Sequence, residues 1–131
     1  MQILMLPLLA CLASHSLAKN QIHVRYCPIG IDTYISISDA TIEREAALNG
    51  YSFDLDSSRA VDNVLAKFKA NSDSAQCDFD EGNLRMLIYS AQGSLLKVDN
   101  NAIAKRKDGC WKSSPKDVKL LLRNLMNIYT K

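Results

Sequence analysis

The stretch of residues 83–113 constrains the fold most, because it sets several strand-like runs between very short turns. These runs cover residues 84–90, 94–98, 102–107 and 110–113. In the first run, Leu84, Met86 and Ile88 alternate with their neighbours, so we expect them to share one buried face of a strand. Turns of two or three residues join antiparallel neighbours, whereas a parallel pair needs a long crossover. The stretch therefore predicts an antiparallel β-meander.

The last turn of this meander leads into a helix. Asp108-Gly109 is the strongest hairpin signal in the chain and predicts a type I′ turn, which needs positive φ. We expect Ser114 to cap the helix, with Pro115 at its first position and Asp117 at its third. Its apolar stripe consists of Val118, Leu121, Leu122, Leu125, Met126 and Tyr129. Such a stripe must pack on the sheet.

The first half of the chain mixes strands with two helices. Strands are predicted at 21–26, 32–38 and 51–55, and helices at 40–48 and 58–70. In the first strand His23 and Arg25 occupy the polar face, opposite the apolar residues. Helix 40–48 is expected to be capped by Ser38 or Asp39 and to end at Asn49-Gly50. Helix 58–70 is expected to be capped by Ser57 or Ser58.

Helices and strands are not regularly interleaved along the chain, which disfavours a parallel, doubly wound sheet. We predict an α+β fold, with an antiparallel sheet that includes the C-terminal meander and is packed by about three helices. Residues 19–131 are predicted to form one domain, long enough to bury a real core.

The first eighteen residues are expected to be a cleaved signal peptide. They contain no Asp, Glu, Lys or Arg, and small residues stand at Ser16 and Ala18, where cleavage rules require them. The apolar run is shorter than the roughly 20 residues that span a bilayer, so we expect no transmembrane segment. Periplasmic or secreted localisation follows. An alternative is a lipoprotein, with Cys11 acylated after Leu8-Leu9-Ala10.

Three cysteines remain after such cleavage: Cys27, Cys77 and Cys110. In an oxidising compartment two of them are expected to pair, and three pairings are possible. The polar, loop-like surroundings of Cys77 and Cys110 favour a disulfide between these two. Cys27 is then a buried thiol beside the first strand.

The residues offer little catalytic chemistry. His23 is the single histidine of the expected mature chain and precedes Cys27 by four residues, so both would share a face if one strand held them. The alternation favours an exposed strand histidine instead. The acidic run 77–82 fails as a calcium loop, because Gly82 and Tyr89 occupy ligand positions. We expect no catalytic residue, no metal site and no cofactor, since nucleotide-binding glycine motifs are also missing.

Charge points to a protein partner rather than to nucleic acid. The net charge of +2 arises from 16 basic and 14 acidic side chains, which is not the strongly basic balance of a nucleic-acid binder. The final hairpin is locally basic, and its candidate partner-binding residues are Arg106, Lys107, Trp111 and Lys112. The alternative is a solvated edge protected by lysines, with Trp111 packed under the last helix.

The chain resembles a known kind of protein in three segments. The first is 29–45, a strand followed by a capped helix; the second is Cys77-Asp78-Phe79-Asp80, which leads into the strand Leu84–Ile88. The third is the meander, which ends at Asp108-Gly109 and is followed by a helix capped by Ser114-Pro115. In these it resembles small exported bacterial proteins of unknown function, some of which are similar to immunity proteins against secreted toxins. The resemblance implies binding and carries over no catalytic residue.

The function expected from these observations is that of a non-enzymatic periplasmic or secreted binding protein. It would act as an inhibitor or immunity protein for a secreted enzyme or toxin. Two alternatives stay open. One is a small cell-envelope enzyme that uses Cys27 with His23, and the other is a lipid-anchored structural component of the envelope.

Overall fold

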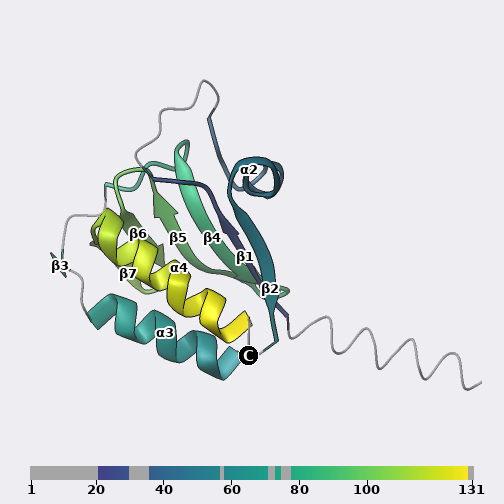
Figure 1. The fold of residues 1–131 in the computed structure, drawn as a ribbon. Helices are drawn as coiled ribbons and strands as arrows, with labels where there is room; N and C mark the ends of the chain where they lie inside the picture. The colour runs from purple at the N-terminus through teal and green to yellow at the C-terminus, as the bar shows by residue number, and fades with distance from the viewer. Residues whose placement is uncertain (1–20, 30–35, 57, 71–72, 75–77, 130–131) are drawn as a thin grey trace, which may run out of the picture.

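The computed structural model describes residues 21–29, 36–56, 58–70, 73–74 and 78–129 (Figure 1). The expected signal peptide, Cys11 of the alternative lipoprotein prediction and most of the expected strand 32–38 lie outside these residues. At the end of that expected strand, Ile37 forms an isolated parallel bridge with Asn83.

The described chain forms a seven-stranded sheet in the order β2-β1-β4-β5-β6-β7-β3, and every strand pair is antiparallel. The strands are β1 Ile22–Tyr26, β2 Tyr51–Leu55, β3 Asp73–Ser74, β4 Leu84–Ser90, β5 Gly93–Asp99, β6 Ile103–Arg106 and β7 Gly109–Lys112. The helices are α2 Ile42–Asn49, α3 Ser58–Ala70 and α4 Pro115–Tyr129. The predicted α+β class, with its antiparallel C-terminal meander, is confirmed.

Two helices cover one face of the sheet and the third packs on the other. α3 and α4 lie side by side over the sheet, and α2 contacts β1, β2 and β4 (Figure 1). The larger core lies under α3 and α4 and includes Val24, Leu65 and Leu125, all fully buried. A smaller core under α2 joins Ile42 and Ala46 to Cys27.

The stripes of α3 and α4 agree with the sequence prediction. Val61, Leu65 and Phe68 of α3 are buried, as are Val118, Leu121, Leu122 and Leu125 of α4. The Asp117 backbone N–H donates a 3.1 Å hydrogen bond to Ser114 Oγ, so Ser114 caps α4 as expected. Tyr129 differs, because its side chain is 59% exposed at the end of the stripe.

β4 departs from a simple alternation. Met86 and Ile88 enter the larger core, whereas Leu84 enters the smaller core on the opposite face. A register shift between Leu84 and Met86 reverses the direction of the side chain there. The expectation that Leu84, Met86 and Ile88 share a face is therefore wrong for Leu84. As a central strand, β4 also buries Arg85 and Leu87.

The predicted start of α2 is also wrong. The helix begins at Ile42 rather than at residue 40, and Thr41 occupies the N-cap position without a side-chain cap. Ser38 contributes through its backbone, because its carbonyl accepts the Ile42 N–H at 2.9 Å and its N–H donates to Thr41 Oγ1 at 2.9 Å. The helix ends at Asn49 with Gly50 at the C-cap, as predicted.

The β6–β7 turn is not of type I′. Arg106 pairs with Gly109, so the two central residues are Lys107 and Asp108. A type I′ turn needs positive φ at both, yet Ala102 is the one non-glycine residue with positive φ in the described chain. Gly109, with φ of 154°, begins β7 instead.

Candidate functional site

A groove of about 420 Å³ lies where two turns of the meander meet at one end of the sheet. The β4–β5 turn and the β6–β7 turn are neighbours because β5 and β6 pair in antiparallel register, with Lys97 opposite Lys105. The lining residues are Gln92, Gly93, Ser94, Leu95, Lys97, Lys105, Arg106 and Lys107. Half of this lining is cationic and none of it is acidic.

Two of the four cations are held by nearby carboxylates. Lys97 Nζ lies 2.7 Å from Asp39 Oδ2 and 3.7 Å from Glu81 Oε2. Burial alone would lower the pKa of Lys97, but the hydrogen bond and charge of Asp39, together with Glu81, raise it above its usual value. Lys105 Nζ lies 2.9 Å from Glu81 Oε1. These pairs fix one wall of the groove.

Arg106 and Lys107 differ from that wall. The Arg106 Nε–H donates to the Leu95 carbonyl at 3.1 Å, which ties the side chain across to β5. Lys107 is exposed at the turn. No ion pair with either residue is found in the described part of the chain, and the neighbouring Asp108 carboxylate is 2.9 Å from Lys69 Nζ instead. Both cations can therefore receive an anionic ligand.

The other two candidate contact residues lie elsewhere. Trp111 is only 4% exposed and belongs to the larger core, with its ring centroid 5.7 Å from that of Phe68. The prediction that Trp111 binds a partner is therefore wrong. Alternation along β7 turns its side chain inward, where it packs against α3. Lys112 follows it in the strand and is exposed, but it does not line the groove.

The Cys27–His23 pair of the alternative hypothesis is not assembled by the described contacts. His23 Nδ1 lies 2.7 Å from Asp54 Oδ1, and its ring packs on Tyr89 at 4.8 Å. Cys27 is a free thiol that packs in the smaller core. Burial raises its pKa, although Arg85 acts in the opposite direction. A nucleophile needs the thiolate, which a raised pKa disfavours.

The expected Cys77–Cys110 disulfide stays a prediction, since Cys77 lies outside the described residues. The chain just before it is placed, because Ser74 of β3 pairs with Trp111 of β7 and Asp73 pairs with Lys112. β3 thus places Ser74, three residues before Cys77, beside the strand that carries Cys110.

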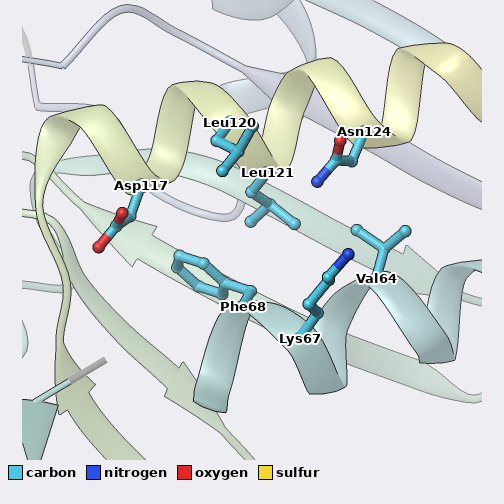
Figure 2. Close-up of a pocket in the computed structure, with 7 residues that line it drawn as sticks. All are labelled: Val64, Lys67, Phe68, Asp117, Leu120, Leu121 and Asn124. Atoms are coloured by element: carbon cyan, nitrogen blue, oxygen red, sulfur yellow. The ribbon is translucent and has the colours of Figure 1, made fainter. Parts of the chain in front are cut away.

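A second, smaller hollow of about 190 Å³ separates α3 from α4 (Figure 2). Its lining residues are Val64, Lys67, Phe68, Asp117, Leu120, Leu121 and Asn124. Figure 2 shows Phe68 and Val64 of α3 near Leu121 of α4, with the amino group of Lys67 between Val64 and Leu121 and with Asp117 and Asn124 towards the two ends. No convergent set of titratable groups points into it, so it offers packing space rather than chemistry.

The sequence indicated Arg106 and Lys107 as contact residues, but it did not connect Lys97 with the hairpin that carries them. The register that sets Lys97 opposite Lys105 depends on where the β5–β6 turn falls, and a hydrophobic pattern locates turns only coarsely.

No group of three or more His, Cys, Asp or Glu side chains that could hold a metal ion occurs among the residues placed by the structure. Within the same residues, no helix is long and apolar enough to cross a membrane. Comparison with protein-family models, curated proteins and solved structures gives no match for this chain.

Proposed function

We propose that this chain is a non-enzymatic exported binding protein, which acts as an inhibitor or immunity protein by holding an acidic segment of a secreted enzyme or toxin. The observation that carries the proposal is the groove between the β4–β5 and β6–β7 turns, lined by four cations and no acid. Arg106 and Lys107 provide the charge for the ligand, because neither forms an ion pair with a carboxylate among the residues that the structure describes.

The remaining lining of the groove is Gln92, Gly93, Ser94 and Leu95. The amide of Gln92 and the hydroxyl of Ser94 can hydrogen-bond to the backbone of a bound peptide segment. Arg106 is positioned by its bond to the Leu95 carbonyl, so less side-chain entropy is lost when it pairs with a carboxylate. Lys97 and Lys105 stay bound to Asp39 and Glu81, so they fix the wall of the groove and leave Arg106 and Lys107 to attract an acidic ligand.

The test is titration of the purified protein with a glutamate decapeptide, followed by NMR amide shifts and calorimetry. We expect shifts confined to residues 92–97 and 105–107, and affinity that falls as salt rises, because exposed charges are screened. Arg106→Gln combined with Lys107→Gln should weaken binding roughly tenfold or more. A glutamine decapeptide should not bind.

Lys116→Gln combined with Lys119→Gln is the matched control, because it removes the same charge from the exposed side of α4. This control should leave binding unchanged. Equal loss in both double variants would show that only net charge matters, and the groove proposal would then be abandoned. Trp111 is left unchanged in this test, since truncating a buried aromatic costs about 3–5 kcal/mol of stability, and weaker binding could then not be assigned to a lost contact.

A further inference from the structure

One edge of the sheet is regular and, among the described residues, unpaired. β2 stands at the end of the strand order, and within the described chain β1 is the strand that pairs with it. The pairing runs without a bulge over five consecutive residue pairs, from Ile22 with Leu55 to Tyr26 with Tyr51. A strand paired on one side presents a row of backbone N–H and C=O groups on the other.

This edge lacks the devices by which monomeric proteins block pairing. Residues 51–55 contain no Lys, Arg or Pro, and the opposite edge of the sheet is only the two-residue β3. The single charge in β2, Asp54, is already held by His23 at 2.7 Å and by Arg25 NH1 at 3.2 Å. A neighbouring strand would therefore meet no free charge.

Exposed apolar side chains gather at the same edge. Four large apolar side chains of the described residues are exposed, and two of them, Tyr51 of β2 and Tyr129 at the end of α4, lie on the same face of the sheet near this edge. The C-terminal end of α4 lies near β2 (Figure 1). Tyr129 at this end is 59% exposed, and its ring centroid is 5.4 Å from that of Phe53. Apolar groups concentrated beside an open strand mark an interaction surface.

We propose that the β2 edge binds the β2 edge of a second copy of this chain, so that two sheets join into one. A two-fold interface must be self-complementary. An antiparallel pairing centred on Phe53 places Tyr51 opposite Leu55 and Ser52 opposite Asp54 of the second copy. No two like charges face each other, and each exposed Tyr129 ring stands beside the two-fold axis because it packs on Phe53.

This surface is independent of the basic groove. β1 and β4 separate β2 from β5, which carries one wall of that groove. Failure to dimerise would therefore leave the groove proposal intact, and failure of the groove to bind its ligand would leave the dimer proposal intact.

The test is sedimentation of the purified protein from low to high micromolar concentration, with hydrogen exchange of residues 51–55 measured at both ends of the range. We expect a monomer–dimer equilibrium and exchange in β2 that slows as concentration rises. Tyr51→Lys combined with Tyr129→Lys should weaken dimerisation roughly tenfold or more, since a charge would be buried in the new interface.

Leu120→Lys is the matched control, because Leu120 is a similarly exposed apolar residue on α4 that lies away from β2. It should dimerise like the unmodified protein. The proposal would be overturned if the protein were a monomer at every concentration and hydrogen exchange in β2 did not depend on concentration. A dimer lost in Leu120→Lys but kept in the tyrosine variant would place the interface on α4 and also overturn it. Circular dichroism confirms that each variant is folded.

Discussion

At the scale of single residues, Asp54 organises the polar side of the sheet edge. It lies on β2 and accepts a hydrogen bond from Arg25 at 3.2 Å, with His23 Nδ1 at 2.7 Å. Arg25 also lies 3.1 Å from Glu43 of α2, close enough for an ion pair although the angle is not that of a hydrogen bond. Alternation along β1 predicted a polar face for Arg25. The structure keeps it on that face and nevertheless buries it to 8% exposure, because α2 lies over it.

This arrangement predicts a pH dependence of stability. Burial alone would raise the pKa of Asp54, but its hydrogen bonds with His23 and Arg25 outweigh burial and hold the pKa below its usual value. A carboxylate with a lowered folded pKa stabilises the protein above its unfolded pKa of about 3.9, and this contribution is lost as pH falls through the folded value. The side chain is 43% exposed, so solvent screening limits the contribution to about 0.5–1 kcal/mol.

Asp54→Asn should therefore lower the free energy of unfolding at pH 7 and have progressively less effect as pH falls below about 4. Urea denaturation at a series of pH values measures the difference. Asp62→Asn, at an exposed position of α3, is the control and should show little change. A constant deficit for Asp54→Asn down to the lowest pH would contradict the ionic origin of the effect.

At the scale of elements, the junction of α2 and β2 depends on one glycine. Sequence reasoning placed Gly50 as a helix stop, which is confirmed, but the structural reason is different from the one expected. Its φ of −149° is not the positive φ of a glycine that ends a helix in the left-handed conformation. A Cβ at this position would lie 1.8 Å from the Tyr26 carbonyl oxygen. The backbone of β1 passes too close for a side chain.

Gly50→Ala should destabilise the protein by about 1–3 kcal/mol, because β1 and the α2–β2 junction must separate to admit the methyl group. Gly82→Ala is the control, since its new Cβ would meet the flexible Ser36 Oγ at 3.1 Å, and its cost should be smaller. Chemical denaturation of both variants gives the comparison. An equal loss in both would mean that backbone entropy, rather than the contact with Tyr26, accounts for the effect.

At the scale of the whole molecule, a covalent link is predicted between the segment after α3 and the meander. β3 pairs with β7, so the chain leading to Cys77 lies beside the strand of Cys110. Closing the loop from Cys77 to Cys110 restricts the unfolded chain and should contribute about 3–4 kcal/mol.

Cys77→Ser combined with Cys110→Ser should lower the unfolding midpoint of the oxidised protein, and a reductant should lower the midpoint of the unmodified protein equally. A reductant should have no effect on the double variant. Mass spectrometry of a non-reduced digest identifies the linked peptides directly. An unmodified protein that is insensitive to reductant would contradict the pairing.

The sequence by itself determined the fold class, most elements and the two cations at the tip of the groove. These follow from local physics: alternation, helical stripes, capping and short turns act over a few residues, and short turns alone require antiparallel neighbours. Tertiary structure decided the burial of Trp111, the reversal of Leu84, the pairing of β3 and the wall formed by Lys97 and Lys105. Each of these depends on which distant segment lies opposite. That choice arises from strand register and helix packing, where a shift of one residue turns a side chain from solvent to core.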